Sequence, residues 1–305
     1  MNEPYHPGER ALQEQFGGRA TALARARAIS DRIPAAASAF IAGQRGCVLA
    51  WAGPDGAPWA VFLVGPAGFA MATPDLRGLE ILLSGATQVL EQVPPYSGLR
   101  EGERIGVLFI DLATRRRLRV NGRILALRDR RAMRIAVEQA YPNCPRYIQR
   151  RRLVTTPADP QMPRIERGQG LTERIATWVA GADTLFVASA GPDGALDASH
   201  RGGAPGFVRL REGVLQIPDY PGNGMFNTLG NLALNPLAGL AFPDFERGFQ
   251  LQLRGEVRLD LHHGEAGGET GGTGRWWAFR PSEWIVSPFN APLAMGLAEP
   301  SPFNP

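Results

Sequence analysis

Residues 46–64, GCVLAWAGPDGAPWAVFLV, place two apolar runs on either side of a Pro-Asp-Gly turn. Apolar runs of this length around such a turn predict a β-hairpin. A Gly-Pro turn follows at residues 65–66, and residues 105–125 add two further runs around a turn at residues 113–114. The pattern is typical of an antiparallel β-meander.

The same pattern occurs a second time in the chain. Residues 184–199, TLFVASAGPDGALDAS, repeat residues 48–61, VLAWAGPDGAPWAV, and the turn glycine at position 53 has its counterpart 138 residues later, at 191. Gly106 likewise corresponds to Gly239, 133 residues later. Shared turns at a nearly constant spacing indicate an internal duplication, and its period is long enough for each copy to be a domain.

The duplication predicts the fold class and the division of the chain. We predict an α+β fold, mainly antiparallel β, with two tandem β-barrel-like domains and flanking helices. The first domain is expected at residues 1–155 and the second at residues 156–305. The proline-rich stretch at residues 153–166 is the expected linker.

Helices are expected at four places, and less regular structure near the C-terminus. Apolar spacing and capping residues predict helices at residues 9–32 (broken near Gly17), 33–44, 127–141 and 171–182 (N-capped by Thr172). Residues 262–274 are predicted to form a flexible glycine-rich loop. Residues 275–287 are predicted to form a final strand or ordered arm, and residues 289–305 an irregular end.

The composition narrows the class of function. All 33 basic residues are arginine and the net charge is +4, so a P-loop lysine and a lysine Schiff base are excluded. The arginines are dispersed without an aromatic-plus-basic motif, and no nucleic-acid partner is expected. The chain has two cysteines, and it lacks both an apolar run of about 18 residues and the apolar core of a signal peptide. These features predict a reduced, cytoplasmic protein without a membrane partner.

One strand of the second copy is polar where the first copy is apolar. Residues 197–203 read DASHRGG, whereas residues 58–65 read PWAVFLVG. Strand alternation divides the polar stretch into one face with Asp197, Ser199 and Arg201 and another with Ala198, His200 and Gly202. The difference between equivalent strands indicates that the second copy holds a ligand, although a solvated edge strand would also be polar.

A glycine-rich loop follows this strand. Residues 219–228, DYPGNGMFNT, are predicted to open a short helix. The unpaired N–H groups and the positive dipole end of a helix start favour an anion such as a phosphate. Asn227 or Thr228 could instead serve only as the helix cap.

These residues resemble a known family. The stretches at residues 141–151, 197–208 and 217–257 (YPNCPRYIQRR, DASHRGGAPGFV and IPDYPGNG through LQLRGEV) are similar to the pyridoxamine 5′-phosphate oxidase-like, FMN-binding split-barrel proteins. The similarity is greatest to the subgroup often fused to a ferredoxin-reductase-type module. It spans nearly the whole chain and implies two split barrels, bound FMN and a homodimer.

The resemblance also implies a set of site residues. The implied FMN-binding residues are Ser199, His200, Arg201, Gly202, Phe207, Val208, Asp219, Asn223, Met225, Phe226, Asn227, Thr228, Gln250 and Gln252, with catalytic roles for His200 and Arg201. The family's phosphate loop often carries Arg or Lys, but Met225 and Asn227 stand at those places here. The phosphate charge must then be met by Arg201, by an arginine of the other domain or subunit, or by N–H groups alone.

Several residues allow two interpretations. The strand face of Gln250 and Gln252 meets either the carbonyl edge of a flavin or water. The arginines at residues 115–117 form either a solvated hairpin end or an anion-binding patch, and the tryptophans at residues 276, 277 and 284 either core or a stacking surface. Cys144 is interpreted as structural.

The hypothesis from the sequence is an FMN-dependent oxidoreductase that transfers hydride or electrons to a small-molecule substrate. NAD(P)H or a separate reductase would supply the electrons. Arg201 would stabilise negative charge on the reduced flavin, and His200 would donate a proton. The alternative is a non-catalytic flavin- or haem-binding carrier.

Overall fold

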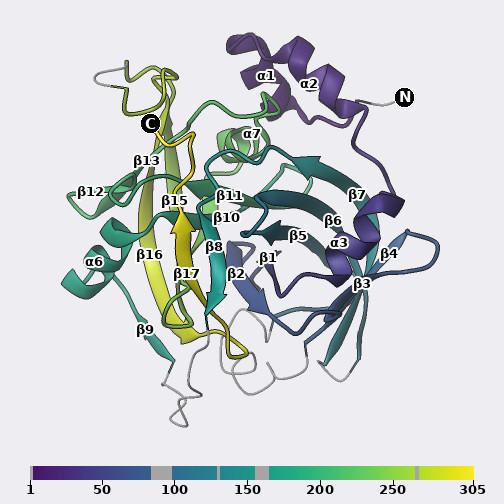
Figure 1. Cartoon of the computed structure of the whole chain (residues 1–305). Coiled ribbons are helices and arrows are strands. Elements are labelled where there is room, and N and C mark those ends of the chain that lie inside the picture. The colour runs from purple at the N-terminus through teal and green to yellow at the C-terminus, as the bar shows by residue number, and fades with distance from the viewer. Residues whose placement is uncertain (1–2, 84–97, 129–130, 155–164, 265–267) are drawn as a thin grey trace.

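Two large antiparallel sheets make up most of the molecule (Figure 1). The structure is a computed structural model that describes residues 3–83, 98–128, 131–154, 165–264 and 268–305. A two-stranded sheet and several short helices complete it. Within these ranges, no helix has the length and apolar character needed to cross a bilayer.

The two sheets have the same strand order. Across the first sheet the strands are β2 (Pro58–Val64), β1 (Gly46–Ala52), β5 (Arg104–Asp111), β6 (Arg116–Arg128), β7 (Ala132–Asn143), β4 (Gly78–Leu82) and β3 (Ala70–Ala72). Across the second they are β11 (Leu196–Gly202), β10 (Thr184–Ala190), β14 (Leu237–Asp244), β15 (Phe249–Asp260), β16 (Trp276–Pro288), β13 (Val214–Pro218) and β12 (Arg209–Arg211), with β9 (Glu166–Gly168) beside β16. The predicted mainly antiparallel β structure is confirmed, and the equal order is what a duplicated sequence produces.

The two sheets pack together through equivalent glycines. A Cβ on Gly106 of β5 would lie 2.7 Å from the carbonyl oxygen of Leu196, and a Cβ on Gly239 of β14 would lie 2.5 Å from that of Pro58. Leu196 and Pro58 are themselves related by the 138-residue offset. Each glycine therefore allows a close approach to the backbone of the opposite half, which relates the halves by an approximate twofold.

The helices flank the sheets largely as predicted. In place of the helix predicted at residues 9–32 the structure has α1 (Pro7–Gln15) and α2 (Arg19–Ala26), which are separated at Gly17, where φ is 66°, and residues 27–32 are not helical. The second predicted helix is the short pair η1 (Ala35–Ala37) and α3 (Ser38–Ala42), and the fourth is α6 (Glu173–Gly181). The Thr172 hydroxyl accepts a hydrogen bond from the Ile175 N–H at 3.4 Å, so the predicted N-cap is confirmed.

The helix predicted at residues 127–141 is wrong. Most of the stretch belongs to β7, whose buried residues Met133, Ile135 and Val137 alternate with exposed or half-buried ones. The period is therefore two, not the 3.6 of a helix. Pairing with both β6 and β4 satisfies the backbone on each side, which local propensity could not indicate.

The irregular end predicted at residues 289–305 is also wrong in part. Strand β17 (Ala294–Glu299) pairs with β8 (Arg150–Val154), so its backbone partner lies far away in the sequence. The predicted strand at residues 275–287 is β16. Residues 155–164 of the predicted linker, with the predicted domain boundary, and residues 265–267 of the predicted loop lie outside the described residues.

Candidate functional site

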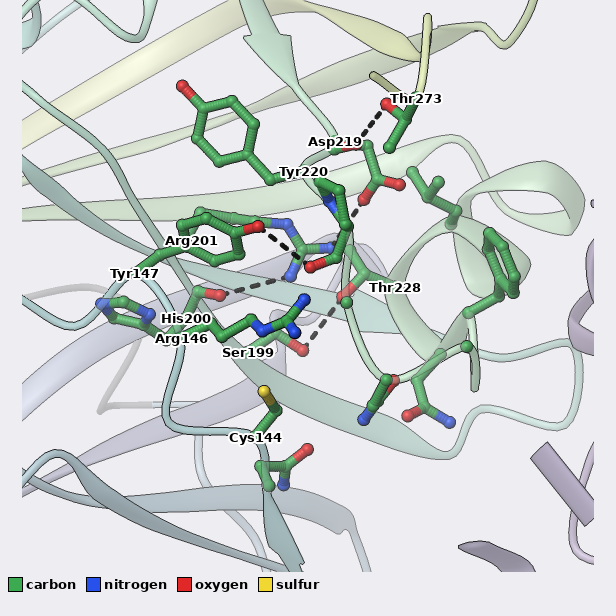
Figure 2. A pocket seen from close by; sticks show the side chains of 18 of the residues that line it. Cys144, Arg146, Tyr147, Ser199, His200, Arg201, Asp219, Tyr220, Thr228 and Thr273 are labelled. Atoms are coloured by element: carbon green, nitrogen blue, oxygen red, sulfur yellow. Dashed lines mark hydrogen bonds and ion pairs between the residues drawn. The ribbon is translucent and has the colours of Figure 1, made fainter. Parts of the chain in front are cut away.

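A pocket of about 350 Å³ lies between the two halves of the chain. The second half contributes β11, residues 219–224 and the start of helix α7 (Asn227–Leu234). The first half contributes β6 and residues 143–147. Figure 2 shows Ser199 and Arg201 of β11 close to Thr228 and Asp219, with the His200 ring on the other side of the strand.

The polar face of β11 is buried, so its interpretation as a solvated edge is wrong. Asp197 accepts hydrogen bonds from Arg119 Nη1 at 2.9 Å, Asn121 Nδ2 at 2.7 Å and Asn231 Nδ2 at 3.0 Å. The Ser199 hydroxyl accepts from the Arg119 guanidinium and from Thr228 Oγ1, the latter at 3.0 Å. Residues from β6, β11 and α7 therefore form one buried polar network at the pocket wall.

Two arginines of the first half belong to the site. Arg117 is part of the run that the sequence left as a possible anion-binding patch, whereas Arg119 was not predicted as a ligand residue. Arg117 and Arg119 of β6 both line the pocket. Arg119 donates from Nε to the Ala198 carbonyl at 3.2 Å and from Nη1 to the Tyr141 hydroxyl at 2.8 Å. The repeat could have identified them, since the 133-residue offset relates them to Gln250 and Gln252.

The lining of the pocket is strongly basic. Its arginines are Arg117, Arg119, Arg146, Arg201 and Arg275. Asp219 is the only acidic side chain among the described lining residues, and it pairs with Arg275 at 2.9 Å and with Arg201 at 3.6 Å. The positive charge of the lining favours an anionic ligand.

Arg117 is the cation that most needs a ligand. Within the described parts of the chain its guanidinium has no acidic partner, and its buried Nε makes no hydrogen bond. Burial, with Arg201 and Arg119 nearby, lowers the pKa of Arg117 to about 9. A bound phosphate or carboxylate would supply both the missing charge and the missing acceptor.

His200 lies on the pocket wall without a hydrogen-bond partner. Its side chain is 4% exposed, and neither ring nitrogen bonds to any described residue. Burial, with Arg117 and Arg201 nearby, lowers the pKa of His200 well below its ordinary value, so the imidazole is neutral at pH 7. A buried polar group without a partner is destabilising and marks a place for a ligand or a proton transfer.

The start of α7 faces the same pocket. Phe226 at its N-cap has φ 59°, and no side chain caps the helix, so the interpretation of Asn227 or Thr228 as the cap is wrong. Asn227 instead donates its side-chain amide to Glu9 of α1. The N-terminal end of α7, at Asn227 and Thr228, lies at the pocket wall, where an anion would be stabilised.

The structure brings together most of the predicted site residues. Those that line the pocket are Ser199, His200, Arg201, Gly202, Asp219, Asn223, Phe226, Asn227 and Thr228. Phe207 and Val208 lie instead in the core of the second sheet, and Met225 is buried among Tyr5, Ala22 and Tyr141. Apolar side chains of this kind are best buried away from a charged pocket.

Gln250 and Gln252 lie outside the pocket. Both bond to the backbone of β2: Gln250 accepts from the Phe62 N–H at 2.8 Å, and Gln252 donates to the Ala60 carbonyl at 2.9 Å. They therefore face neither a flavin nor water. Gln250 and Gln252 lie on β15, which the approximate twofold relates to the pocket strand β6. They therefore contact the interface between the halves at the place related by symmetry to the pocket.

The N-terminal helices close one side of the pocket. Phe16 lines it and stacks on Phe226, with ring centroids 5.8 Å apart, and the Arg275 guanidinium lies 4.9 Å from the Phe16 ring. A Cβ on Gly8 would lie 2.3 Å from the Gly230 carbonyl oxygen, so α1 packs tightly on α7. Nothing in the local sequence linked residues 7–16 to this site.

Comparison with known proteins finds similarity to one family over part of the chain. Residues 33–162 match the family model described as pyridoxamine 5′-phosphate oxidase. No curated protein sequence matches the chain. Similar solved structures include a putative pyridoxamine 5′-phosphate oxidase from Lactobacillus delbrueckii, at 13% identity over 38% of this chain and 93% of that one, with a TM-score of 0.31.

Two further solved structures are similar at the same level. HupZ from Group A Streptococcus is 14% identical over 43% of this chain and 98% of its own, with a TM-score of 0.26. A heme binding protein from Mycobacterium smegmatis is 17% identical over 40% of this chain and 55% of its own, with a TM-score of 0.25. The similarity to the pyridoxamine 5′-phosphate oxidase family model is therefore established for residues 33–162, which lie mainly in the first half of the chain.

Proposed function

We propose that this protein is an FMN-dependent oxidoreductase, built from two tandem split barrels that divide near residue 155. The observation that carries the proposal is the basic pocket between the halves, in which Arg117 has no acidic partner among the described residues. Its volume of about 350 Å³ lies at the lower end of the range of about 300–1,000 Å³ for small-molecule sites. FMN combines a planar ring system with a phosphate, and both fit this lining.

The phosphate would be held by charge and by N–H donors. Arg117 and Arg119 supply the cations that the loop at residues 222–228 lacks. The N–H groups at the start of α7 add donors that need no basic side chain. In this proposal the loop needs no basic residue at Met225 or Asn227, because arginines of the other half of the chain bind the phosphate.

The remaining polar residues would orient the cofactor and move a proton. When bound, FMN supplies hydride or electron transfer. Arg201, held by Asp219, would offset negative charge on the ring, and Ser199 and Thr228 would fix the position of Arg119. The neutral imidazole of His200 would hold a proton at one ring nitrogen for transfer to or from a substrate. NAD(P)H or a separate reductase would be the electron donor.

A titration of the purified protein with FMN tests the proposal. We expect quenching of flavin fluorescence on binding, and about 10–100-fold weaker binding by Arg117→Gln, because one charge-assisted contact is lost. Arg247→Gln is the matched control, since the Arg247 side chain is 82% exposed and does not line the pocket. Unchanged FMN binding by Arg117→Gln would contradict the proposed phosphate site. Anaerobic bleaching of the bound flavin by NADH or NADPH then tests the oxidoreductase activity.

A second candidate function is a haem- or flavin-carrying protein without turnover. One observation favours it: His200 is neutral and buried, and neither ring nitrogen bonds to a described residue. A neutral imidazole is the form that binds metal. This candidate predicts a Soret shift on addition of haem that His200→Ala abolishes, together with no reduction of bound FMN by NAD(P)H.

A further inference from the structure

We infer that the chain holds one ligand site and not two, because side-chain amides and aromatic rings fill the place that the internal repeat relates to the pocket. This place, between β2 and β15, is called the sister position below. The inference rests on the proposed function only for the choice of FMN as the probe. Two equivalent halves packed around a twofold axis would form two equivalent sites if both places were open to a ligand.

The pocket and the sister position are equivalent in three dimensions. At the pocket, Arg119 Nε donates to the Ala198 carbonyl at 3.2 Å. At the sister position, Gln252 Nε2 donates to the Ala60 carbonyl at 2.9 Å. The donors are related by the 133-residue offset and the acceptors by the 138-residue offset, so the same contact is made twice with different side chains.

An amide clamp, formed by Gln250 and Asn290, binds the backbone of β2. Gln250 accepts from the Phe62 N–H at 2.8 Å and donates to the Phe62 carbonyl at 3.3 Å. Asn290 accepts from the Val64 N–H at 2.6 Å and donates to the Val64 carbonyl at 2.5 Å. Each amide thus replaces a neighbouring strand, and the polar backbone groups that a ligand could use are already paired.

The pocket has no such clamp. His200 and Gly202 of β11 correspond to Phe62 and Val64. Among the described residues, no glutamine or asparagine side chain bonds to the backbone of either. Arg117 stands where the sister position has Gln250, and a guanidinium offers only donors, whereas an amide offers both a donor and an acceptor. The Gln250 amide pairs with both backbone groups of Phe62, whereas the Arg117 guanidinium needs an external acceptor. The neighbouring Gln252 donates to the Ala60 carbonyl, and its Oε1 has no hydrogen-bond partner among the described residues.

Aromatic rings occupy the rest of the sister position. Phe62, the counterpart of His200, packs against Phe186, Phe245 and Phe289, with centroid distances of 5.7, 5.4 and 5.4 Å. All four rings are buried. The His200 ring also packs on Phe186, with centroids 5.7 Å apart, but its nitrogens lack hydrogen-bond partners among the described residues. At the sister position Phe245 and Phe289 complete a packed apolar cluster around Phe62, which leaves no room for a ligand. The first half therefore serves the pocket as a partner subunit would, while its own site is filled.

The experiment combines calorimetric titration of the full chain with FMN and light scattering of the bound species. We expect one FMN per chain, also in Gln250→Ala, in which one half of the clamp is removed but the aromatic cluster remains. Two FMN per chain would overturn the inference, and so would one FMN per two chains, which would place the site between subunits.

Amide hydrogen exchange of the full chain provides a second test, which does not depend on FMN. The amides of Phe62 and Val64 should be protected in the wild type, and Gln250→Ala should accelerate exchange at Phe62 while Asn290 keeps Val64 protected. Unprotected Phe62 and Val64 amides in the folded wild type would overturn the closed sister position. Absence of FMN binding with both amides protected would instead reject FMN as the ligand and leave the closed sister position supported.

Discussion

Arg119 of β6 and Asp197 of β11 form a buried ion pair across the two halves of the chain, with Nη1 and Oδ1 2.9 Å apart. Their side chains are 4% and 11% exposed, and the pair joins the first half to the wall of the pocket. Removal of one member of a buried pair leaves the other without compensation, which destabilises far more than the loss of an exposed pair.

Asp197→Asn should therefore lower the free energy of unfolding by about 3–5 kcal/mol. The substitution keeps the shape of the side chain but removes the charge opposite Arg119, and its N–H₂ must face one of the donors, either Asn121 on the Oδ1 side or Asn231 on the Oδ2 side. Urea denaturation measures the change. Asp31→Asn is the control, because Asp31 pairs with Arg77 at a similar distance of 2.9 Å but both side chains are at least half exposed, and a change of less than about 1 kcal/mol is expected. Equal effects of the two substitutions would contradict the buried role of Asp197.

Glu9 should make the stability of the protein depend on pH. Burial, and next the carboxylate of Asp197, raise the pKa of Glu9 to about 8. The folded state then keeps the proton to about pH 8, while the unfolded state loses it near the ordinary value of 4.5. The contribution of Glu9 to the free energy of unfolding therefore falls as the pH rises from about 4.5 to about 8 and stays lowest above that.

Glu9→Gln should remove this part of the pH dependence, because the amide imitates the protonated acid beside Asn227 and the His6 N–H. Denaturation curves at several pH values between 5 and 9 give the slope for each variant. Glu14→Gln on the same helix is the control, since Glu14 is exposed and should leave the slope as it is in the wild type. If the free energy of unfolding of Glu9→Gln changed with pH as steeply as that of the wild type, another group would be responsible for the pH dependence.

His200→Phe should stabilise the ligand-free protein and weaken ligand binding. Phenylalanine is the residue at the equivalent position 62, and it removes two buried ring nitrogens that lack partners. A gain of about 1–2 kcal/mol in the free energy of unfolding is expected. Thermal unfolding with and without FMN measures both effects, and a loss of stability without ligand would contradict the absence of a partner for His200.

Gly106→Ala and Gly239→Ala should destabilise the protein to a similar extent, by about 1–3 kcal/mol each. In both variants the new methyl group would meet backbone atoms of the opposite half at less than 3 Å. Gly181→Ala is the control, because a Cβ at this C-terminal residue of α6 meets nothing within 4 Å. Clearly unequal effects at Gly106 and Gly239 would argue against equivalent packing of the two halves.

Local spacing in the sequence was sufficient to predict several features. The duplicated Pro-Asp-Gly turns predicted the repeat, and the equal strand order of the two sheets agrees with it. Residues 199–202 of the polar strand and most of the loop at residues 219–228 line the same pocket. These features depend on turn chemistry and on alternation along one strand, which are properties of neighbouring residues.

Only the tertiary structure decided which distant residues meet. The helix expected at residues 127–141 is strand β7 because β4 and β6 supply its partners, and residues 294–299 form a strand because β8 lies beside them. Arg117 and Arg119 reach the pocket of the second half, whereas Gln250 and Gln252, expected there, bind β2. The sequence alone determined the repeat and the polar strand, since both arise from short-range patterns. The packing of the two halves determined the composition of the site, because a buried charge or amide is stable only beside a partner that the long-range fold supplies.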